Sequence, residues 1–348
     1  MAGKSVLIIG PGFIGWPVLD LLVAEGYHVT GLVRREEHAE GIRKSRARAV
    51  LGDLHNADLI AQETTNADIV IHTATADDLP SATAVLTGIR RRAAIGRRTI
   101  YIHTSGTGVL DDGAAGAFSS STIYADDEPA AIDALPDSAP HRAIDLTIVN
   151  AARELGEKAK IAILLPPVVY GYVEGHDRLS IQIPTLARFA LVNGWAGHVG
   201  KGLGVESCVH VRDLARGYVV LLHAMEERDS GWVLGNPYFF CENGAEGEFE
   251  WREAARRVAE GLHKAGKLYK ADVGEFRRED YKQLFGEVTE KVLGHNSRSR
   301  AKRLRELGWE AREKGVWESW EEDELPALLR EWDARKGERR SAYEKLAA

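Results

Sequence analysis

Cysteine is nearly absent from this sequence, which has two cysteines, Cys208 and Cys241, among 348 residues. The two do not form a Cys-x-x-Cys pair, so neither a disulfide framework nor a cysteine-based zinc cluster is expected. The 12 histidines are scattered without the spacing of metal ligands, and we predict no metal site. This composition favours a reducing compartment, and the cytoplasm is the expected location.

Long apolar runs are also missing, because no stretch of about 18 apolar residues occurs. The apolar run at residues 5–10 is too short for a signal peptide and leads straight into a strand pattern. Neither sign of charge dominates, since the net charge of −7 comes from 45 basic and 52 acidic residues mixed along the chain. We therefore predict that neither a membrane nor nucleic acid is a partner.

Several catalytic signatures do not occur either. The chain has no His-Glu-x-x-His, no Gly-x-Ser-x-Gly elbow and no P-loop pattern of Gly-x-x-x-x-Gly-Lys followed by Ser or Thr. These absences argue against a zinc protease, an α/β-hydrolase and a P-loop nucleotidase.

The chain does contain a series of short apolar runs, each about as long as a β-strand, with helical patterns between most of them. The runs lie at residues 5–10, 28–34, 47–53, 68–74, 99–105 and 160–171. Runs this apolar suit strands that are buried on both faces, as in a parallel sheet covered by helices. We predict the α/β class: a Rossmann doubly wound parallel sheet with a smaller, mainly helical substrate domain.

A change of pattern after Gly171 sets the predicted domains. Residues 1–171 are expected to form the Rossmann domain, completed by about 208–240. The substrate domain would take residues 172–207 and 241–348.

Finer features are expected within these domains. Residues 107–140 are typical of a long loop, 182–193 of a helix and 232–236 of a short strand. From about residue 249 the pattern is mostly helical and charged. There, one apolar helical face is expected to pack on the protein rather than on a membrane, and it comprises Trp317, Trp320, Leu328, Leu329 and Trp332.

The strongest motif is a strand that runs into Gly10-Pro-Gly12-Phe13-Ile14-Gly15 and then into a helix. Gly10 permits a tight turn, Gly12 lets the backbone approach a pyrophosphate, and Gly15 lets helix and strand pack closely. The helix N-terminus offers free N–H groups to the anion. This pattern predicts a dinucleotide site, with Phe13 and Ile14 inside it.

The residues at the end of the second predicted strand indicate which dinucleotide the site binds. An NAD site usually has Asp or Glu there, whereas this chain has Arg34 and Arg35, whose guanidinium groups suit a 2′-phosphate. Glu36 and Glu37 follow and are expected to lie past the strand end. We predict NADP(H) as the cofactor, with a solvated basic pair as the alternative.

Residues at other strand ends are expected beside the cofactor. Asp53 ends the third strand, where its carboxylate suits the adenine amino group, and Leu54 follows it. Thr73, Ala74 and Thr75 end the fourth strand.

Four separated motifs resemble those of the extended or atypical short-chain dehydrogenase/reductases, which include nucleoside-diphosphate-sugar epimerases. They are GPGFIG at 10–15, DIVIHTATA at 68–76, LLPPVVYG at 164–171 and VHVRDLARG at 209–217. A weaker match is NSRSRAKRLRELGW at 296–309. The resemblance covers most of the chain and implies an NAD(P)-binding Rossmann domain with a smaller substrate domain. Many members have Gly-x-x-Gly-x-x-Gly, so the shorter motif here points to an atypical branch.

The resemblance fails at the usual catalytic pair. The family has Ser or Thr after the fifth strand and Tyr-x-x-x-Lys on the next helix, but no Tyr-x-x-x-Lys occurs between residues 100 and 165. His141 and Asp145 have the same spacing, which would place them on one helix face as an acid/base pair. A purely local pairing of Asp145 is the alternative.

The catalytic hydroxyl has more than one candidate. Ser105 fits best, although the alignment could place Gly106 at that position and let Thr107 substitute. Tyr124 is a further candidate proton donor, with a plain surface tyrosine as the alternative.

The resemblance also implies cofactor and substrate contacts. Pro166 and Val168 would lie beside the nicotinamide, and Tyr170 would lead into the substrate region, where Thr107 is also expected. Two arginines are candidates for an anionic substrate, with unpaired surface arginines as the alternative: Arg178 and Arg298. The resemblance assigns His210 and Asp213 a structural role.

The predicted function is an NADP(H)-dependent oxidoreductase that reduces a small carbonyl or imine. The first alternative is a redox-neutral epimerase or lyase of the same fold. The second is a non-catalytic NADP-sensing regulator resembling the NmrA-like proteins, which the missing Tyr-x-x-x-Lys supports. A small-molecule substrate is the expected partner, and a homodimer is the default expectation for the assembly.

Overall fold

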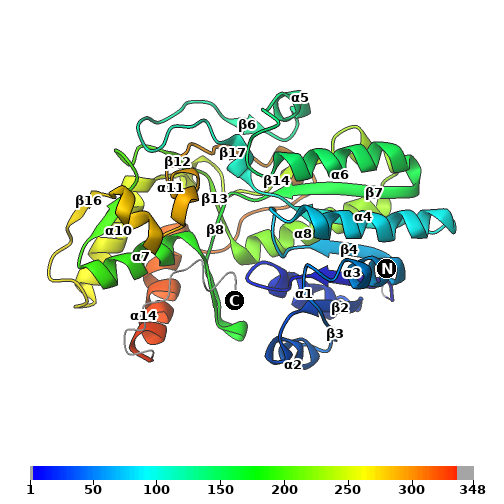
Figure 1. Cartoon of the computed structure of the whole chain (residues 1–348), viewed down its shortest axis with the longest axis horizontal. Helices are drawn as coiled ribbons and strands as arrows, with labels where there is room; N and C mark the ends of the chain where they lie inside the picture. Colours follow the sequence, from blue (N-terminus) through cyan, green and yellow to red (C-terminus); the bar gives the residue numbers. More distant parts are fainter. Residues whose placement is uncertain (1–2, 335–348) are drawn as a thin grey trace.

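The computed structural model describes residues 3–334, and its centre is a seven-stranded parallel sheet (Figure 1). The strand order is β14-β7-β5-β4-β1-β2-β3. The strands are β1 (Ser5–Ile9), β2 (His28–Val33), β3 (Arg48–Leu51), β4 (Ile69–His72), β5 (Thr99–Thr104), β7 (Ala159–Leu165) and β14 (Tyr238–Phe240). The chain reverses its direction of travel across the sheet between β1 and β4, so their carboxyl ends form the crevice where doubly wound folds bind ligands. The predicted Rossmann fold is confirmed.

Helices cover both faces of this sheet. On one face, α1 and α8 pack against each other, and on the other α3, α4 and α6 lie side by side (Figure 1). The helices are α1 (Gly15–Ala24), α2 (Glu36–Lys44), α3 (Ala57–Asn66), α4 (Leu79–Ala94), α6 (Arg142–Leu155) and α8 (Val211–Glu227). This cover explains why the strands are apolar on both sides.

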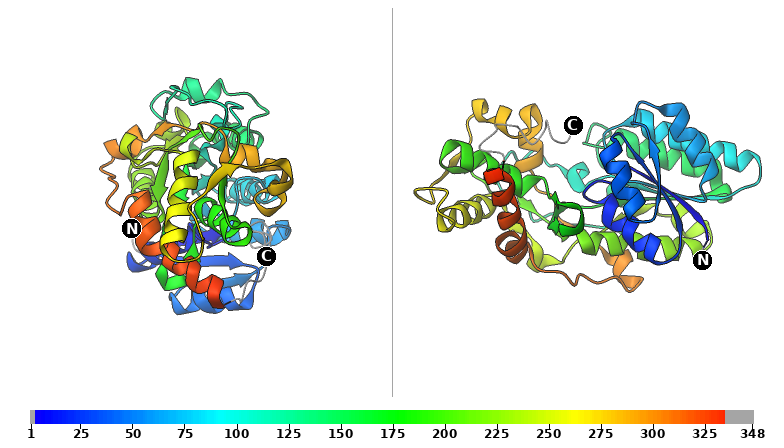
Figure 2. Two further views of the ribbon diagram at one scale, coloured as in Figure 1. Left: turned by 90° about the vertical axis from the view of Figure 1, so that its left-hand side faces the viewer. Right: turned by 90° about the horizontal axis from the view of Figure 1, so that it is seen from below.

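The second lobe is built from the segment after β7 and from the C-terminal part of the described chain (Figure 2). Its helices are α7 (Gln182–Asn193), α10 (Trp251–Lys264), α11 (Thr289–Leu293), α13 (Val316–Ser319) and α14 (Leu325–Ala334). Its short strands are β8 (Val168–Tyr170), β9 (Tyr172–Val173), β10 (Arg178–Leu179), β11 (Ala196–His198), β12 (Val205–Glu206), β13 (Cys208–His210), β15 (Phe249–Glu250) and β16 (Val273–Glu275). The helix expected at 182–193 is confirmed.

Two hydrophobic cores underlie the two lobes. The first surrounds the seven-stranded sheet. It includes Leu304 of the helix α12 (Lys302–Glu306) and Trp309, which comes shortly after this helix. The second contains Phe189, Trp251 and Trp320, with Trp317 packed against it. Leu328 belongs to the same core and Leu329 packs against it, so four of the five predicted residues of the apolar C-terminal face pack on the protein. The fifth, Trp332, is half-buried and is not part of this core. The domain boundaries drawn from the sequence remain a prediction, and their last residues, 335–348, lie outside the described part.

The long segment expected at 107–140 is mostly irregular. It contains only β6 (Tyr124–Ala125), the helix α5 (Pro129–Asp133) and a single 3-10 turn at Thr107–Leu110. β6 pairs in parallel with β17 (Ser299–Arg300), so this segment bridges the sheet to the C-terminal part of the chain.

Two details differ from the sequence-based expectations. The strand expected at 232–236 is wrong, because Gly231–Leu234 forms the short helix α9 and the strand β14 begins only at Tyr238. Asn236 and Pro237 separate the two, and the aromatic residues after them supply the better strand sequence. The apolar run at 160–171 is two strands, since Pro166 and Pro167 interrupt it between β7 and β8.

Within residues 3–334, none of the helices is both long enough and apolar enough to cross a membrane.

Candidate functional site

The glycine loop between β1 and α1 is shaped by its neighbour at the end of β4. Gly10 has a φ of +74°, and a Cβ added to it would lie 2.4 Å from the Cβ of Ala74. A Cβ on Gly15 would lie 2.3 Å from Oγ1 of Thr73, whose hydroxyl donates a hydrogen bond to the Gly10 carbonyl at 3.0 Å. Both positions therefore require glycine, and Thr73 and Ala74 fix the loop against the sheet.

Gly12 differs from these two glycines. A Cβ added to it would meet only the Gly10 carbonyl oxygen, at 3.8 Å, so the space above it is open. It lies at the N-terminus of α1, where the first N–H groups have no carbonyl within the helix to bond. The half-buried Phe13 and Ile14 follow in the same turn. An open space over free N–H groups fits the pyrophosphate of a dinucleotide.

We expect Gly12→Ala to lower the affinity for NADPH and NADH alike by roughly 10-fold or more, because the methyl group would occupy the space a pyrophosphate needs. The fold should tolerate it, since Gly12 is not in the left-handed region. Calorimetric titration together with the melting temperature would check this. Gly10→Ala is the contrasting variant, because it should lower the melting temperature as well. Unchanged binding by Gly12→Ala would contradict the assignment.

Residues at the ends of β2 and β3 lie where the adenosine half of a dinucleotide is expected. Arg34 directly follows β2, and Arg35 is the residue before α2. Glu36 and Glu37 lie in the first turn of α2, past the strand end, as expected. The partner of Arg35 is Glu37, with 3.3 Å between Nη1 and Oε1.

Asp53 and Leu54 lie just after β3, and both are half-buried. One carboxylate oxygen of Asp53 accepts a hydrogen bond from the His55 N–H at 2.9 Å. The hydroxyl of Thr75 accepts one from the Asp77 N–H at 3.1 Å. These bonds order the two loops, and contact with adenine remains a prediction.

The end of β5 carries a buried polar pair. Ser105 donates a hydrogen bond from Oγ to Oδ2 of Asp145 at 2.9 Å, and both side chains are buried. The Ser105 N–H is anchored on the Leu164 carbonyl of the neighbouring strand β7. Burial raises the pKa of Asp145 to about 7, although the hydrogen bond from Ser105 acts in the opposite direction and lowers it. Asp145 can therefore change its protonation state near neutral pH.

His141 does not stack on Asp145, so the expected direct pair is wrong. The helix α6 begins at Arg142, and His141 precedes it with a φ of +65° in the left-handed region. This backbone turn takes the side chain off the helix face. The Nδ1 atom of His141 lies 2.6 Å from Oδ1 of Asp77, on the loop after β4. This hydrogen bond lowers the pKa of the Asp77 carboxyl.

The His141 ring lies over two glycines at the end of β5. Cβ atoms added to Gly106 and Gly108 would lie 3.3 and 3.1 Å from its Nε2. Small residues at these positions therefore make room for the imidazole. With Nδ1 on Asp77, Nε2 is the ring nitrogen that lies against these two glycines, just after the end of β5.

Other predicted site residues have partners within the protein. The Thr107 hydroxyl lies 2.7 Å from Oγ of Ser297. The Tyr170 hydroxyl donates to the Lys314 carbonyl at 2.8 Å and is fully buried. Arg298 forms two bonds to one Glu248 oxygen, at 2.9 and 2.7 Å. These contacts hold the segment 107–124 and the second lobe together, and a substrate role for the residues remains a prediction.

Three further positions are placed by the strands. Pro166 directly follows β7, and its carbonyl accepts the Thr107 N–H at 3.0 Å. Val168 is buried in β8, where it pairs with Cys208. Tyr124 is half-buried in β6, and its N–H donates to the Arg298 carbonyl at 2.9 Å. Their predicted contacts with cofactor or substrate are not decided by these bonds.

Arg178 has its contacts on the first lobe, at α1 and α2. Its Nη2 is 2.8 Å from Nε2 of His38 on α2. Neither His38 nor Asp77 was singled out in the sequence. An acidic residue after β4 and a histidine one turn into α2 are weak signals, because only the folded chain brings them to His141 and Arg178.

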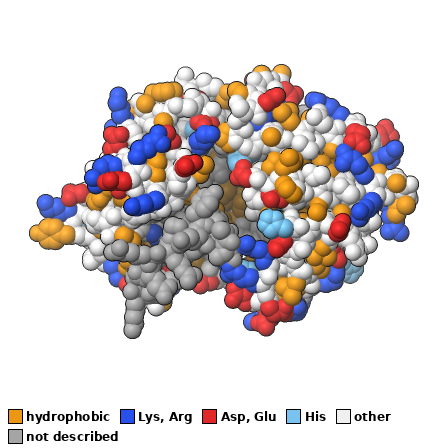
Figure 3. Space-filling view, in the orientation of Figure 1, with side chains coloured by type: hydrophobic (Ala, Val, Ile, Leu, Met, Phe, Trp, Pro, Cys, Tyr) orange, Lys and Arg blue, Asp and Glu red, His pale blue; other side chains and the backbone are white. Residues whose placement is uncertain are grey.

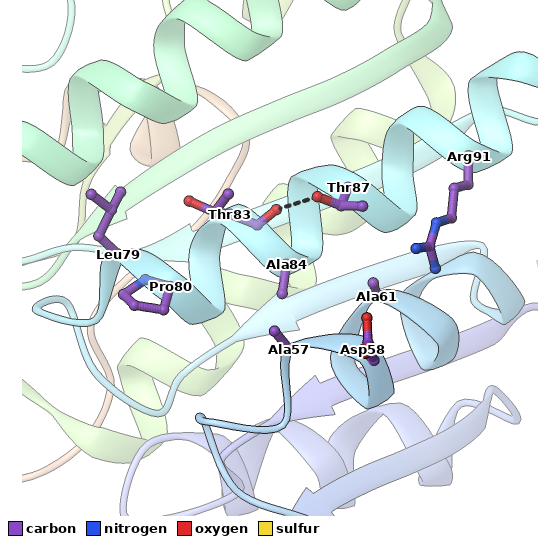
Figure 4. A pocket seen from close by; sticks show the side chains of 9 residues that line it. All are labelled: Ala57, Asp58, Ala61, Leu79, Pro80, Thr83, Ala84, Thr87 and Arg91. Atoms are coloured by element: carbon purple, nitrogen blue, oxygen red, sulfur yellow. Dashed lines mark hydrogen bonds between the residues drawn. The ribbon is translucent and has the colours of Figure 1, made fainter.

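The face of the molecule in Figure 3 is hollowed between the two lobes, and basic side chains gather along its lower border. A different groove, of about 390 Å³, lies between α3 and α4 (Figure 4). Small residues and threonines line much of it, with Asp58 and Arg91 among them. None of the predicted site residues lines this groove.

The comparisons with known proteins agree with this geometry. A profile of the NAD dependent epimerase/dehydratase family matches residues 6–235. The chain is 32% identical over 301 residues to the oxidase ucsJ of an Acremonium species, which covers 78% of this chain and 84% of that protein. It is 30% identical over 115 residues to a 4-hydroxy-2-methyl-3-oxo-4-farnesyl-3,4-dihydroquinoline-1-oxide ketoreductase of Stigmatella aurantiaca, over 30% of this chain and 34% of that one.

Solved structures show the same fold. The UDP-glucose 4-epimerase of Thermotoga maritima, crystallised with UDP-glucose, superposes with a TM-score of 0.63 at 18% identity, covering 95% of this chain and 99% of that one. At this identity the likeness concerns the fold alone. The profile match spans more than half of the chain and therefore shows the family: this protein belongs to the NAD dependent epimerase/dehydratase family.

Proposed function

We propose that this protein is an NADP(H)-dependent oxidoreductase that reduces a small carbonyl or imine. The observation that carries the proposal is the placement of His141. Its spacing to Asp145 in the sequence is that of the family's missing tyrosine and lysine. Its ring is held by Asp77 through Nδ1, and its Nε2 lies against Gly106 and Gly108 just after β5. An imidazole beside a carboxylate is a common acid/base unit.

The chain's residues would share the work as follows. A bound nicotinamide would supply the hydride for the carbonyl or imine carbon. His141 would give its Nε2 proton to the carbonyl oxygen or the imine nitrogen, and the product would be an alcohol or amine. Asp77 keeps the ring oriented through Nδ1.

Ser105 has a positioning role in this scheme. Because its hydroxyl donates to Asp145, its oxygen lone pairs are left to accept a hydrogen bond. An alcohol product, or a protonated imine, offers such a donor. The left-handed backbone at His141 supports the same view, since strained residues are frequent at functional sites.

The preference for NADP(H) is supported by Arg34 and Arg35 at the end of β2, where an NAD site has an acid. Two of the relatives are named as an oxidase and a ketoreductase, which supports redox chemistry. The free, buried Cys208 and Cys241 support a reducing compartment such as the cytoplasm.

The proposal is tested first by binding. Calorimetry should show that NADPH binds more tightly than NADH, and the double variant Arg34→Ala, Arg35→Ala should lose roughly 10- to 100-fold in affinity for NADPH but little for NADH. Equal losses for both cofactors would remove the 2′-phosphate assignment.

The reaction is then tested with aldehydes, ketones and cyclic imines, by the absorbance of the reduced nicotinamide. Consumption of NADPH with any of them supports the reductase. Selective binding without any consumption would overturn it in favour of a redox-neutral epimerase or lyase, or of an NADP sensor.

A further inference from the structure

A hairpin of the second lobe reaches across to the cofactor-binding lobe. It is formed by β9 and β10 and lies against α1 and α2 (Figures 1 and 2). At its tip, Nε2 of His176 lies 2.6 Å from Oδ2 of Asp20 on α1. The His176 ring also stacks on Trp16, with centroids 4.3 Å apart and planes 30° apart. These contacts fix the hairpin beside the glycine loop, because Trp16 directly follows Gly15.

The side chain of Arg178 extends from this hairpin toward α2. Its guanidinium lies 5.9 Å from the centroid of the Trp16 ring, and it donates to Nε2 of His38 at 2.8 Å. Since a guanidinium can only donate, His38 accepts this bond as a neutral imidazole. Burial lowers the pKa of His38, and the positive charge of Arg178 lowers it further.

Arg178 is therefore close to the end of β2. Burial lowers the pKa of Arg178 most, and the positive charge of Arg35 lowers it further. The positive charges of Arg34 and Arg35 also lower the pKa of His38. Three guanidinium groups and an imidazole thus gather around the start of α2, from two parts of the chain separated by more than a hundred residues.

Acidic groups face this cluster as well. Glu37 contacts Arg35 and lies 3.7 Å from Nε2 of His38, and the negative charges of Glu37 and Asp177 act on Arg178. The guanidinium groups of Arg34, Arg35 and Arg178 repel one another, and a phosphate bound between them would relieve that repulsion. The N-terminus of α2 adds a partial positive charge of its own.

We propose that Arg178 binds the 2′-phosphate of NADP(H) together with Arg34 and Arg35, so that this phosphate site is assembled from both lobes. The proposal rests on the preference for NADP(H) proposed above. Arg178 is then a cofactor residue rather than a substrate residue. The β9–β10 hairpin then acts as a strap, that is, a segment of the second lobe that lies across the adenosine end of the cofactor. A cofactor that carries the 2′-phosphate would link this hairpin to α2.

The test uses two small probes, adenosine 2′,5′-bisphosphate and adenosine 5′-monophosphate, which differ only in the 2′-phosphate. Calorimetry on the full chain should show that the bisphosphate binds more tightly. Arg178→Ala should weaken the bisphosphate by roughly 10-fold or more and the monophosphate by less than about two-fold. Arg178→Lys should fall between, because it keeps the charge but loses the fork.

Arg256→Ala is the matched control. It removes the same charge from the same lobe, on the surface of α10, where Arg256 pairs with Glu260 at 2.7 Å. It should leave both probes unchanged. Melting temperatures of all variants verify that they are folded.

The outcomes separate this inference from the proposed function. One outcome is that Arg178→Ala keeps the preference for the bisphosphate while the Arg34, Arg35 double variant loses it. The proposed role of Arg178 would then be wrong, and the proposed NADP(H) preference would be retained. If Arg178→Ala weakens both probes equally, its role is structural and the inference also fails. If the unaltered protein shows no preference between the probes, the NADP assignment and the strap fail together.

Discussion

Replacing His141 with alanine is expected to lower turnover by roughly 10²- to 10⁴-fold, the usual contribution of a general acid. NADPH binding should change little, because His141 lies at the end of β5 and not at the glycine loop. The measurement is the rate of NADPH oxidation with a carbonyl or imine substrate found in the absorbance screen, beside calorimetric titration of NADPH. Asp77→Asn should also slow turnover, by a smaller factor, since the hydrogen bond to Nδ1 remains and only the charge is lost.

His223→Ala is the matched control for this prediction. His223 forms a similar pair, with Nε2 2.8 Å from Oε2 of Glu25, but it joins α8 to the C-terminal end of α1. Its loss should leave turnover unchanged. Full activity of His141→Ala, or an equal loss in His223→Ala, would remove His141 from the mechanism.

The second large effect concerns stability. Asp145→Asn is expected to make the free energy of unfolding less sensitive to pH between about 4 and 7. Burial raises the pKa of Asp145 to about 7, from the value of 3.8 for an exposed carboxyl. Between these values the folded protein holds a proton that the unfolded chain has lost, so stability falls as pH rises through this window. Asparagine cannot ionise, and its side-chain oxygen can still accept from Ser105.

The magnitude follows from the size of the shift. A difference of about three pKa units corresponds to roughly 4 kcal/mol, so the variant should gain on the order of 3 kcal/mol over the unaltered protein at pH 8 compared with pH 5. Urea unfolding of both proteins at the two pH values measures this. Other buried acids with raised pKa values, such as Asp126 and Glu324, are present in both proteins and cancel in the difference. Parallel pH profiles would show that Asp145 does not hold its proton near neutrality.

The two predictions together distinguish the role of His141 from that of Asp145, although both residues lie at the start of α6. The His141 side chain is 19% exposed and bonds to Asp77, whereas Asp145 is fully buried and bonds to Ser105. If His141 carries the proton, its variant changes turnover without the stability signature. If Asp145 carries it instead, Asp145→Asn will lose turnover as well as its pH-dependent stability.

The sequence by itself determined the Rossmann architecture. The apolar runs that predicted strands contain β1, β2, β3, β4, β5 and β7, and the glycine motif falls between β1 and α1. Such elements depend on local patterns, because a strand buried on both faces must be apolar throughout and a tight phosphate loop needs glycine at fixed spacing. The family resemblance was readable for the same reason, since its motifs lie at the ends of these strands.

The tertiary structure alone decided how the chemical groups pair. His141 has the right spacing to stack on Asp145, yet one left-handed residue before α6 sends it to Asp77, 64 positions earlier in the chain. Asp145 pairs with Ser105 across 40 positions, and Arg178 reaches His38 across 140. Helical periodicity describes neighbours within one helix, whereas these partners are set by how strands, loops and lobes pack. That is why the sequence showed which residues could do chemistry, and only the fold showed which of them meet.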